Sequence, residues 1–126
     1  MRSIDTNVLV RALVQDVPAQ TQRALTLLKS HPAYVPVTVV LELEWVLRSR
    51  YKMEKLAVLQ TFNALLETQE LEFQSEAAIE RALHLYRQGS AEFADCLHAG
   101  ISAAGGHSPL LTFDQKAGKL AGAKLL

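Results

Sequence analysis

Four carboxylates of this chain lie in apolar stretches of sequence, where an ionised carboxylate is costly unless a cation or hydrogen bonds compensate it. They are Asp5, Glu42, Asp95 and Asp114. Few lysines or arginines lie near them in the sequence to provide that compensation. Oxygen ligands without a cluster of cysteine or histidine select Mg²⁺ or Mn²⁺. The simplest interpretation is that the four carboxylates converge on a bound divalent metal, as in a metal-dependent enzyme.

Two of the four, Asp5 and Asp114, have a structural alternative. Each follows a predicted strand and precedes a predicted helix, where aspartate is a common N-cap. Capping and metal binding are compatible, because different oxygens of one carboxylate can serve each role.

Glu42 has no such alternative. Its helix is apolar almost all round, which predicts burial, and a valine stands four residues further on. Glu44, by contrast, has Arg48 at i+4, a favourable ion-pair spacing.

Asp95 could pair with His98 at i+3, so a structural role stays open for it, whereas Glu92 at i−3 adds a second negative charge. Three polar neighbours could orient the carboxylates or a water, or could be ordinary cap and strand residues: Thr6, Asn7 and Thr112.

Composition places limits on the class of protein. The 126 residues are 49% hydrophobic, which predicts one folded domain over 1–126. The formal net charge is zero, so the strongly basic footprint of a stand-alone nucleic-acid binder is missing. The single cysteine, Cys96, excludes an intrachain disulfide and is expected to be a small buried residue. No apolar run reaches the roughly 18 residues of a membrane span, and the first residues lack the pattern of a signal peptide, so a cytoplasmic location is expected.

A local basic cluster and two aromatic residues have open interpretations. The cluster is either a solvated face or a patch that contacts phosphate: Arg48, Arg50, Lys52 and Lys55. Trp45 and Tyr51 could stack on RNA bases, although core or dimer interface is the preferred interpretation for Trp45.

Short strands alternate with helices along the whole chain. Strands are predicted at 2–5, 34–37, 71–73, 110–112 and 123–126. Helices are predicted at 7–13, 18–29, 38–50 with Thr38 as cap, 54–66, 93–104 and 115–120, and a further helix is predicted from its cap at Ser75 through Tyr86 to a stop near Gly89. This alternation predicts an α/β fold with a parallel sheet covered by helices on both faces. Ligands of such sheets bind at the carboxyl ends of the strands, where Asp5 and Asp114 are placed.

Four ordered motifs resemble the PIN domain, and more narrowly the VapC toxins of bacterial toxin–antitoxin pairs. They read IDTNVL at 4–9, VLELEWVL at 40–47, FADCLHA at 93–99 and LTFD at 111–114. One such motif is a weak signal, but four in order over nearly the whole chain are a strong one. Glu92 departs from the short acidic or polar residue expected before the third motif.

The resemblance implies a three-layer α/β/α sandwich around a short parallel sheet. It implies Mg²⁺ or Mn²⁺ held by Asp5, Glu42, Asp95 and Asp114, and cleavage of single-stranded RNA such as tRNA or rRNA loops. It further implies a homodimer and a VapB-like antitoxin whose tail covers the active site. A catalytically silent binding module with this fold, or a DNA or flap nuclease with the same metal site, remains an alternative.

Overall fold

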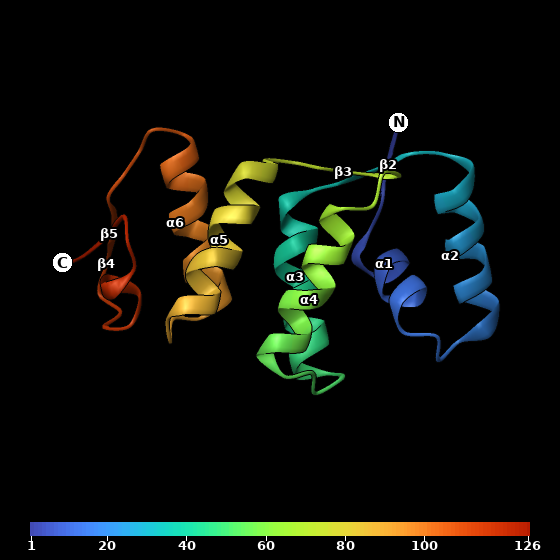
Figure 1. Cartoon of the computed structure of the whole chain (residues 1–126), viewed down its shortest axis with the longest axis horizontal. Coiled ribbons are helices and arrows are strands. Elements are labelled where there is room, and N and C mark those ends of the chain that lie inside the picture. The colour runs from blue at the N-terminus through green and yellow to red at the C-terminus, as the bar shows by residue number, and fades with distance from the viewer. The chain divides into compact units, whose positions relative to one another are not determined.

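The computed structural model describes all residues, 1–126, and the chain divides into two compact units. Unit 1 is Met1–Gln74 and unit 2 is Ser75–Leu126. Figure 1 labels the helices and strands of both units. No helix in either unit combines the length and the apolar character that crossing a lipid bilayer requires.

Unit 1 is built on three short parallel strands in the order β1-β2-β3. Its elements are β1 (Arg2–Ser3), α1 (Thr6–Leu13), α2 (Pro18–Ser30), β2 (Ala33–Val35), α3 (Val37–Ser49), α4 (Lys55–Leu66) and β3 (Leu71–Phe73). Since all three strands run the same way, their carboxyl ends share one edge of the sheet. Helices α1 and α3 begin just past the ends of β1 and β2, so the first turns of both helices belong to this edge.

The apolar core of unit 1 explains why α3 forms where it does. Its buried apolar residues recur at helical spacing and line one face: Val39, Val40, Leu43, Val46 and Leu47. They belong to the same core as residues of α1 and α4 such as Leu9 and Phe62. Trp45 lies outside this pattern and is 52% exposed, so the core interpretation of Trp45 is wrong.

Unit 2 is a helix pair followed by a small sheet. Its elements are α5 (Glu76–Gln88), α6 (Phe93–Ala104), β4 (Leu110–Thr112), the single 3₁₀ turn η1 (Ala117–Lys119) and β5 (Ala123–Leu125). Helices α5 and α6 pack side by side. Their backbones approach so closely that a Cβ added at Gly100 would lie 2.5 Å from the carbonyl oxygen of Ala78. The rings of Tyr86 and Phe93 close one end of the pair, edge to face with centroids 5.3 Å apart.

The predicted α/β class with a short parallel sheet is confirmed: six α-helices alternate with short strands, and every strand pair is parallel. The predicted bounds of β3, α6 and β4 agree with the structure residue for residue. The buried cysteine is also confirmed, since Cys96 is fully enclosed.

Two local predictions are wrong. Thr38 does not cap α3, because the helix begins one residue earlier, after Pro36, and the Gln74 side chain accepts a hydrogen bond from the Val37 amide at 2.9 Å. The cap thus comes from the residue after β3, which local sequence does not reveal. The helix predicted over 115–120 is only the turn η1, in a segment that contains Gly118.

Candidate metal centre

Asp5 lies between β1 and α1 and is the N-cap of α1. Its Oδ1 accepts a hydrogen bond of 2.7 Å from the Thr6 amide. The side chain is exposed, and the second oxygen makes no hydrogen bond within the chain. Asp5 therefore combines a capping role with one oxygen that is free to bind a ligand.

Thr6 connects Asp5 to Glu42. It is the first residue of α1 and only 3% exposed, and its hydroxyl donates a short hydrogen bond to Oε1 of Glu42 on α3. One buried residue thus donates to both carboxylates, through its amide and through its hydroxyl. Although 36 residues separate Thr6 from Glu42, the packing of α1 against α3 brings the first and second motifs together.

The predicted burial of Glu42 is wrong. Glu42 is exposed on α3, whereas Glu44 is 2% exposed and forms an ion pair of 2.8 Å with Nε of Arg48. The apolar face of α3 passes through Leu43 and Val46, which turns Glu42 towards solvent. The cost of burying a charge thus applies to Glu44, which Arg48 compensates as its i+4 spacing predicts. Because Glu42 is exposed, the cost of burying a charge is no evidence that Glu42 binds a metal.

Asp95 lies in the first turn of α6 and is half-buried. No hydrogen bond or ion pair joins it to His98, which is exposed, so the alternative of an Asp95–His98 pair is wrong. The amide groups at the start of a helix carry partial positive charge, which favours a carboxylate in this turn. Glu92 occupies the N-cap position without a capping hydrogen bond from its side chain.

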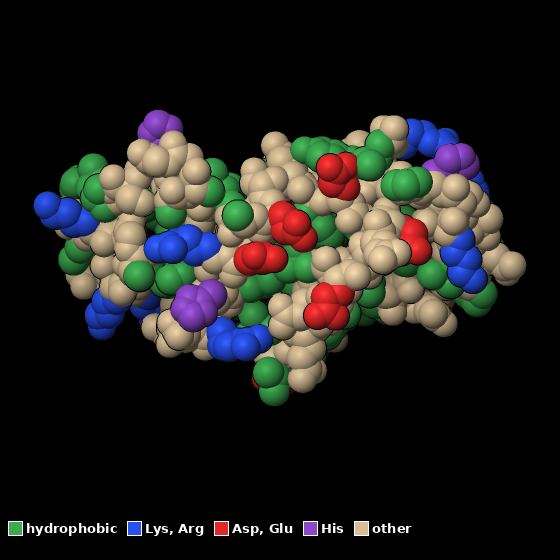
Figure 2. Space-filling view, turned by 45° about the horizontal axis from the view of Figure 1, so that its top comes forward, with side chains coloured by type: hydrophobic (Ala, Val, Ile, Leu, Met, Phe, Trp, Pro, Cys, Tyr) green, Lys and Arg blue, Asp and Glu red, His purple; other side chains and the backbone are tan.

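Asp114 follows β4 and caps the turn η1. Its Oδ1 accepts a hydrogen bond of 2.8 Å from the Ala117 amide, and its own amide donates to the Thr112 hydroxyl at 3.0 Å. Like Asp5, it keeps one oxygen without a hydrogen bond and is exposed. On the face drawn in Figure 2, acidic side chains reach the surface.

The two units hold two of the four carboxylates each. Unit 1 joins Asp5 and Glu42 through Thr6, and unit 2 anchors Asp95 and Asp114 on separate elements. Neither unit by itself brings three His, Cys, Asp or Glu side chains together. The available metal-ligand atoms are carboxylate oxygens, and the one cysteine is buried. A set of this kind fits a hard divalent cation such as Mg²⁺ or Mn²⁺ and does not fit a zinc site.

Sequence reasoning did not single out Arg11. It lies on α1 at i+4 from Asn7, and this spacing places the two side chains on one face of the helix. Both line a groove between α1 and α2.

Comparison with known proteins gives a clear family result. The PIN domain family matches residues 3–123, which is nearly the whole chain and includes all four carboxylates. No curated protein matches the chain.

Proposed function

Since this chain belongs to the PIN domain family, we propose that it is a Mg²⁺- or Mn²⁺-dependent endoribonuclease that cleaves single-stranded regions of RNA. PIN domains are generally nucleases that use divalent metals, so hydrolysis of phosphodiester bonds follows from the family. The proposal adds the substrate, such as a tRNA or rRNA loop. It also adds the biological role, the toxin of a toxin–antitoxin pair that forms a homodimer and is inhibited by a VapB-like antitoxin over its active site.

The observation that carries the proposal is the double hydrogen bond of Thr6. A nuclease needs its carboxylates held in place before substrate arrives, because preorganised charges stabilise the transition state without reorganisation. The buried Thr6 fixes one oxygen of Asp5 and one of Glu42. The other oxygen of each carboxylate stays available.

We propose that both units form one nuclease domain whose four carboxylates act on one site. A divalent ion bound there would supply activation of water and charge stabilisation on the phosphodiester. Asp5, Asp95 and Asp114 would be ligands of the ion. Glu42 would be a further ligand or would orient the attacking water.

The reaction is hydrolysis at phosphorus. The water oxygen bonds to phosphorus while the bond from phosphorus to the 3′ oxygen breaks, and the water's proton passes through solvent to the leaving oxygen. The products are a 5′-phosphate and a 3′-hydroxyl.

The test is cleavage of bulk cellular RNA by purified protein with Mg²⁺ or Mn²⁺. An EDTA lane and the variants Asp5→Asn and Glu42→Gln run beside it. Glu80→Gln is the matched control, because Glu80 is an exposed carboxylate on α5 without a hydrogen bond or an ion pair. We expect discrete fragments from the wild type and Glu80→Gln, and loss of about a hundredfold to a thousandfold in rate from Asp5→Asn, as for removal of a transition-state stabiliser.

Two outcomes would contradict the proposal, and a third would invalidate the assay. Intact RNA in every lane would favour a silent binding module. Cleavage of single-stranded or flap DNA, without cleavage of RNA, would show that the substrate is DNA. Fragments that persist in EDTA or in Asp5→Asn would indicate a contaminating nuclease.

A further inference from the structure

A groove of about 500 Å³ lies between α1 and α2, entirely within unit 1. Its walls carry two arginines and two amides, Arg11, Arg23, Asn7 and Gln20, and no carboxylate lines it. The floor is apolar and includes Leu27. A lining of cations and amides over an apolar floor suits a ligand that is anionic and partly apolar.

The groove begins beside the candidate metal centre. Helix α1 starts directly after Asp5, and Asn7, in the first turn of that helix, lines the groove. Arg11 follows one turn further along, about 6 Å by the rise of an α-helix. A strand whose reacting phosphate lies at the proposed metal centre beside Asp5 would therefore pass Asn7 and then Arg11 as it follows α1.

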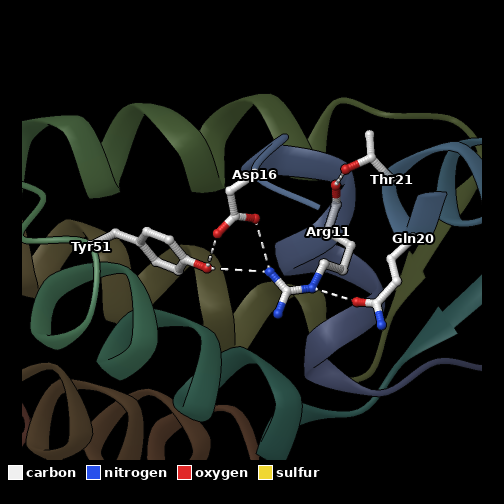
Figure 3. Close-up of polar contacts among 5 residues, drawn as sticks. All are labelled: Arg11, Asp16, Gln20, Thr21 and Tyr51. Atoms are coloured by element: carbon white, nitrogen blue, oxygen red, sulfur yellow. Dashed lines mark hydrogen bonds and ion pairs between the residues drawn. The ribbon is translucent and has the colours of Figure 1, made fainter. Parts of the chain in front are cut away.

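Arg11 is a fixed part of the wall. Its guanidinium donates to Gln20 at 2.7 Å through Nε, and to Asp16 at 2.9 Å and the Tyr51 hydroxyl at 3.4 Å through Nη1. The Tyr51 hydroxyl in turn donates to Asp16 at 3.2 Å. Figure 3 shows these contacts converging on Arg11 from the loop after α1, from α2 and from Tyr51. Asp16 offsets the charge of Arg11, whose main role is to shape the groove.

Arg23 supplies the uncompensated charge. It is exposed on α2, lines the groove, and forms no hydrogen bond or ion pair within the chain. A guanidinium in this state can make a two-point contact with a phosphate without first breaking an ion pair.

We propose that this groove holds the RNA backbone beside the cleaved bond, with Arg23 binding a phosphate and the amides of Asn7 and Gln20 contacting ribose or base. The proposal rests on the proposed function and names a substrate-binding surface for it. An acidic peptide would also suit the charge of Arg23. RNA is favoured because the groove continues from Asp5, and because amides beside an apolar floor match a ribose or base attached to each phosphate.

Binding is measured in the Asp5→Asn background, so that cleavage does not interfere. A fluorescently labelled single-stranded RNA of twelve nucleotides is titrated in EDTA at several salt concentrations. We expect Arg23→Gln to weaken binding about tenfold, as for loss of one charge-assisted contact. We also expect a slope of log K against log salt that is shallower by about 0.7, the value for one phosphate of a single strand.

Lys29→Gln is the matched control. The substitution removes one positive charge from α2, as Arg23→Gln does. Lys29 is exposed and lies outside the lining of this groove. In the cleavage assay with otherwise wild-type protein, Arg23→Gln should raise KM about tenfold and change kcat far less, because Arg23 is placed at binding rather than at the reacting phosphate.

The outcomes separate this proposal from the proposed function. If the wild type cleaves RNA and Arg23→Gln behaves like Lys29→Gln, the groove assignment is wrong and the nuclease stands. If no RNA is cleaved but the salt slope still falls in Arg23→Gln, the groove stands and the catalytic proposal fails. If polyglutamate binds through Arg23 while RNA does not bind, the groove is a protein-docking site and the assignment is overturned.

Discussion

The two units hold their candidate carboxylates in different ways. In unit 1, one buried residue, Thr6, donates to both Asp5 and Glu42: the bond to Asp5 is a local helix cap, whereas the bond to Glu42 depends on the contact between α1 and α3. In unit 2, Asp95 depends on the first turn of α6, and Asp114 on its own capping of η1. Long-range packing therefore sets the contact of Glu42, whereas local backbone geometry sets Asp5 and each carboxylate of unit 2.

This difference bears on how a bound cation would stabilise the chain. In unit 1 the shared donor Thr6 links two carboxylates, and a bound cation would offset the repulsion between them. Unit 2 does not share a hydrogen-bond donor between its two carboxylates. The proposed single site requires one cation to bind carboxylates of both units.

The largest expected effect is stabilisation by metal. Mn²⁺ at about a hundred times its dissociation constant should raise the free energy of unfolding by about 2.7 kcal/mol, because it binds the folded state alone. Thermal denaturation with and without Mn²⁺ measures the shift in Tm. The shift should disappear in Asp5→Asn of unit 1 and equally in Asp114→Asn of unit 2, and should persist in Glu80→Gln. A shift lost only in Asp5→Asn would place the ion in unit 1 alone.

The next largest effect is a loss of stability when the close packing of α5 and α6 in unit 2 is disturbed. Gly100→Ala should lower the free energy of unfolding by about 2 kcal/mol, because the new Cβ would lie 2.5 Å from the Ala78 carbonyl oxygen and force α5 and α6 apart. Alanine normally improves a helix by up to about 1 kcal/mol over glycine, so the sign itself is diagnostic. Urea denaturation measures it, with the exposed His98→Ala on the same helix as control. A stabilised Gly100→Ala would show that the close approach of the two helices is wrong.

A smaller effect tests the shared hydrogen-bond donor directly. Thr6→Val keeps the shape of the side chain and removes the hydroxyl that donates to Glu42, so we expect a loss of about 1 kcal/mol in the free energy of unfolding. Thr112→Val removes an acceptor near the surface and should cost about half as much. The rates of RNA cleavage sharpen the comparison: Thr6→Val should make a second change, Glu42→Gln, less harmful than it is in the wild type. Additive effects of the two changes would mean that Thr6 does not position Glu42.

The capping roles of Asp5 and Asp114 could be predicted from sequence because each depends on a local pattern. Asp5 and Asp114 stand between a strand and a helix or turn, and their capping bonds to residues one and three further on follow from that place. The ion pair of Glu44 with Arg48 is likewise local, at i+4. Such patterns need no knowledge of the tertiary fold.

The burial of Glu42 could have been predicted correctly from the same sequence. The buried positions of α3 repeat with the helical period and leave Glu42 and Trp45, three residues apart, on the other face. The prediction of burial was wrong because it counted apolar residues all round α3 and did not separate the buried face from the exposed one. The hydrogen bond of Thr6 to Glu42, by contrast, depends on the packing of two helices, and the groove at Arg23 depends on how α2 lies against α1. No local pattern contains either contact.

The smallest effect tests a helix cap supplied by a residue distant in sequence. Gln74, after β3, accepts a hydrogen bond from the Val37 amide at the start of α3, whereas the sequence favoured Thr38 as the cap. Gln74→Ala should therefore lower the free energy of unfolding by about 0.5 kcal/mol, the lower end for loss of a cap, because Gln74 is exposed. Thr38→Ala should leave it unchanged. Urea denaturation of both variants decides between the two caps, and a loss in Thr38→Ala alone would restore the local prediction. The cap also bears on the metal centre, because α3 carries Glu42: a frayed first turn of α3 would loosen the hydrogen bond to Thr6 and lower the rate of cleavage in Gln74→Ala more than in Thr38→Ala.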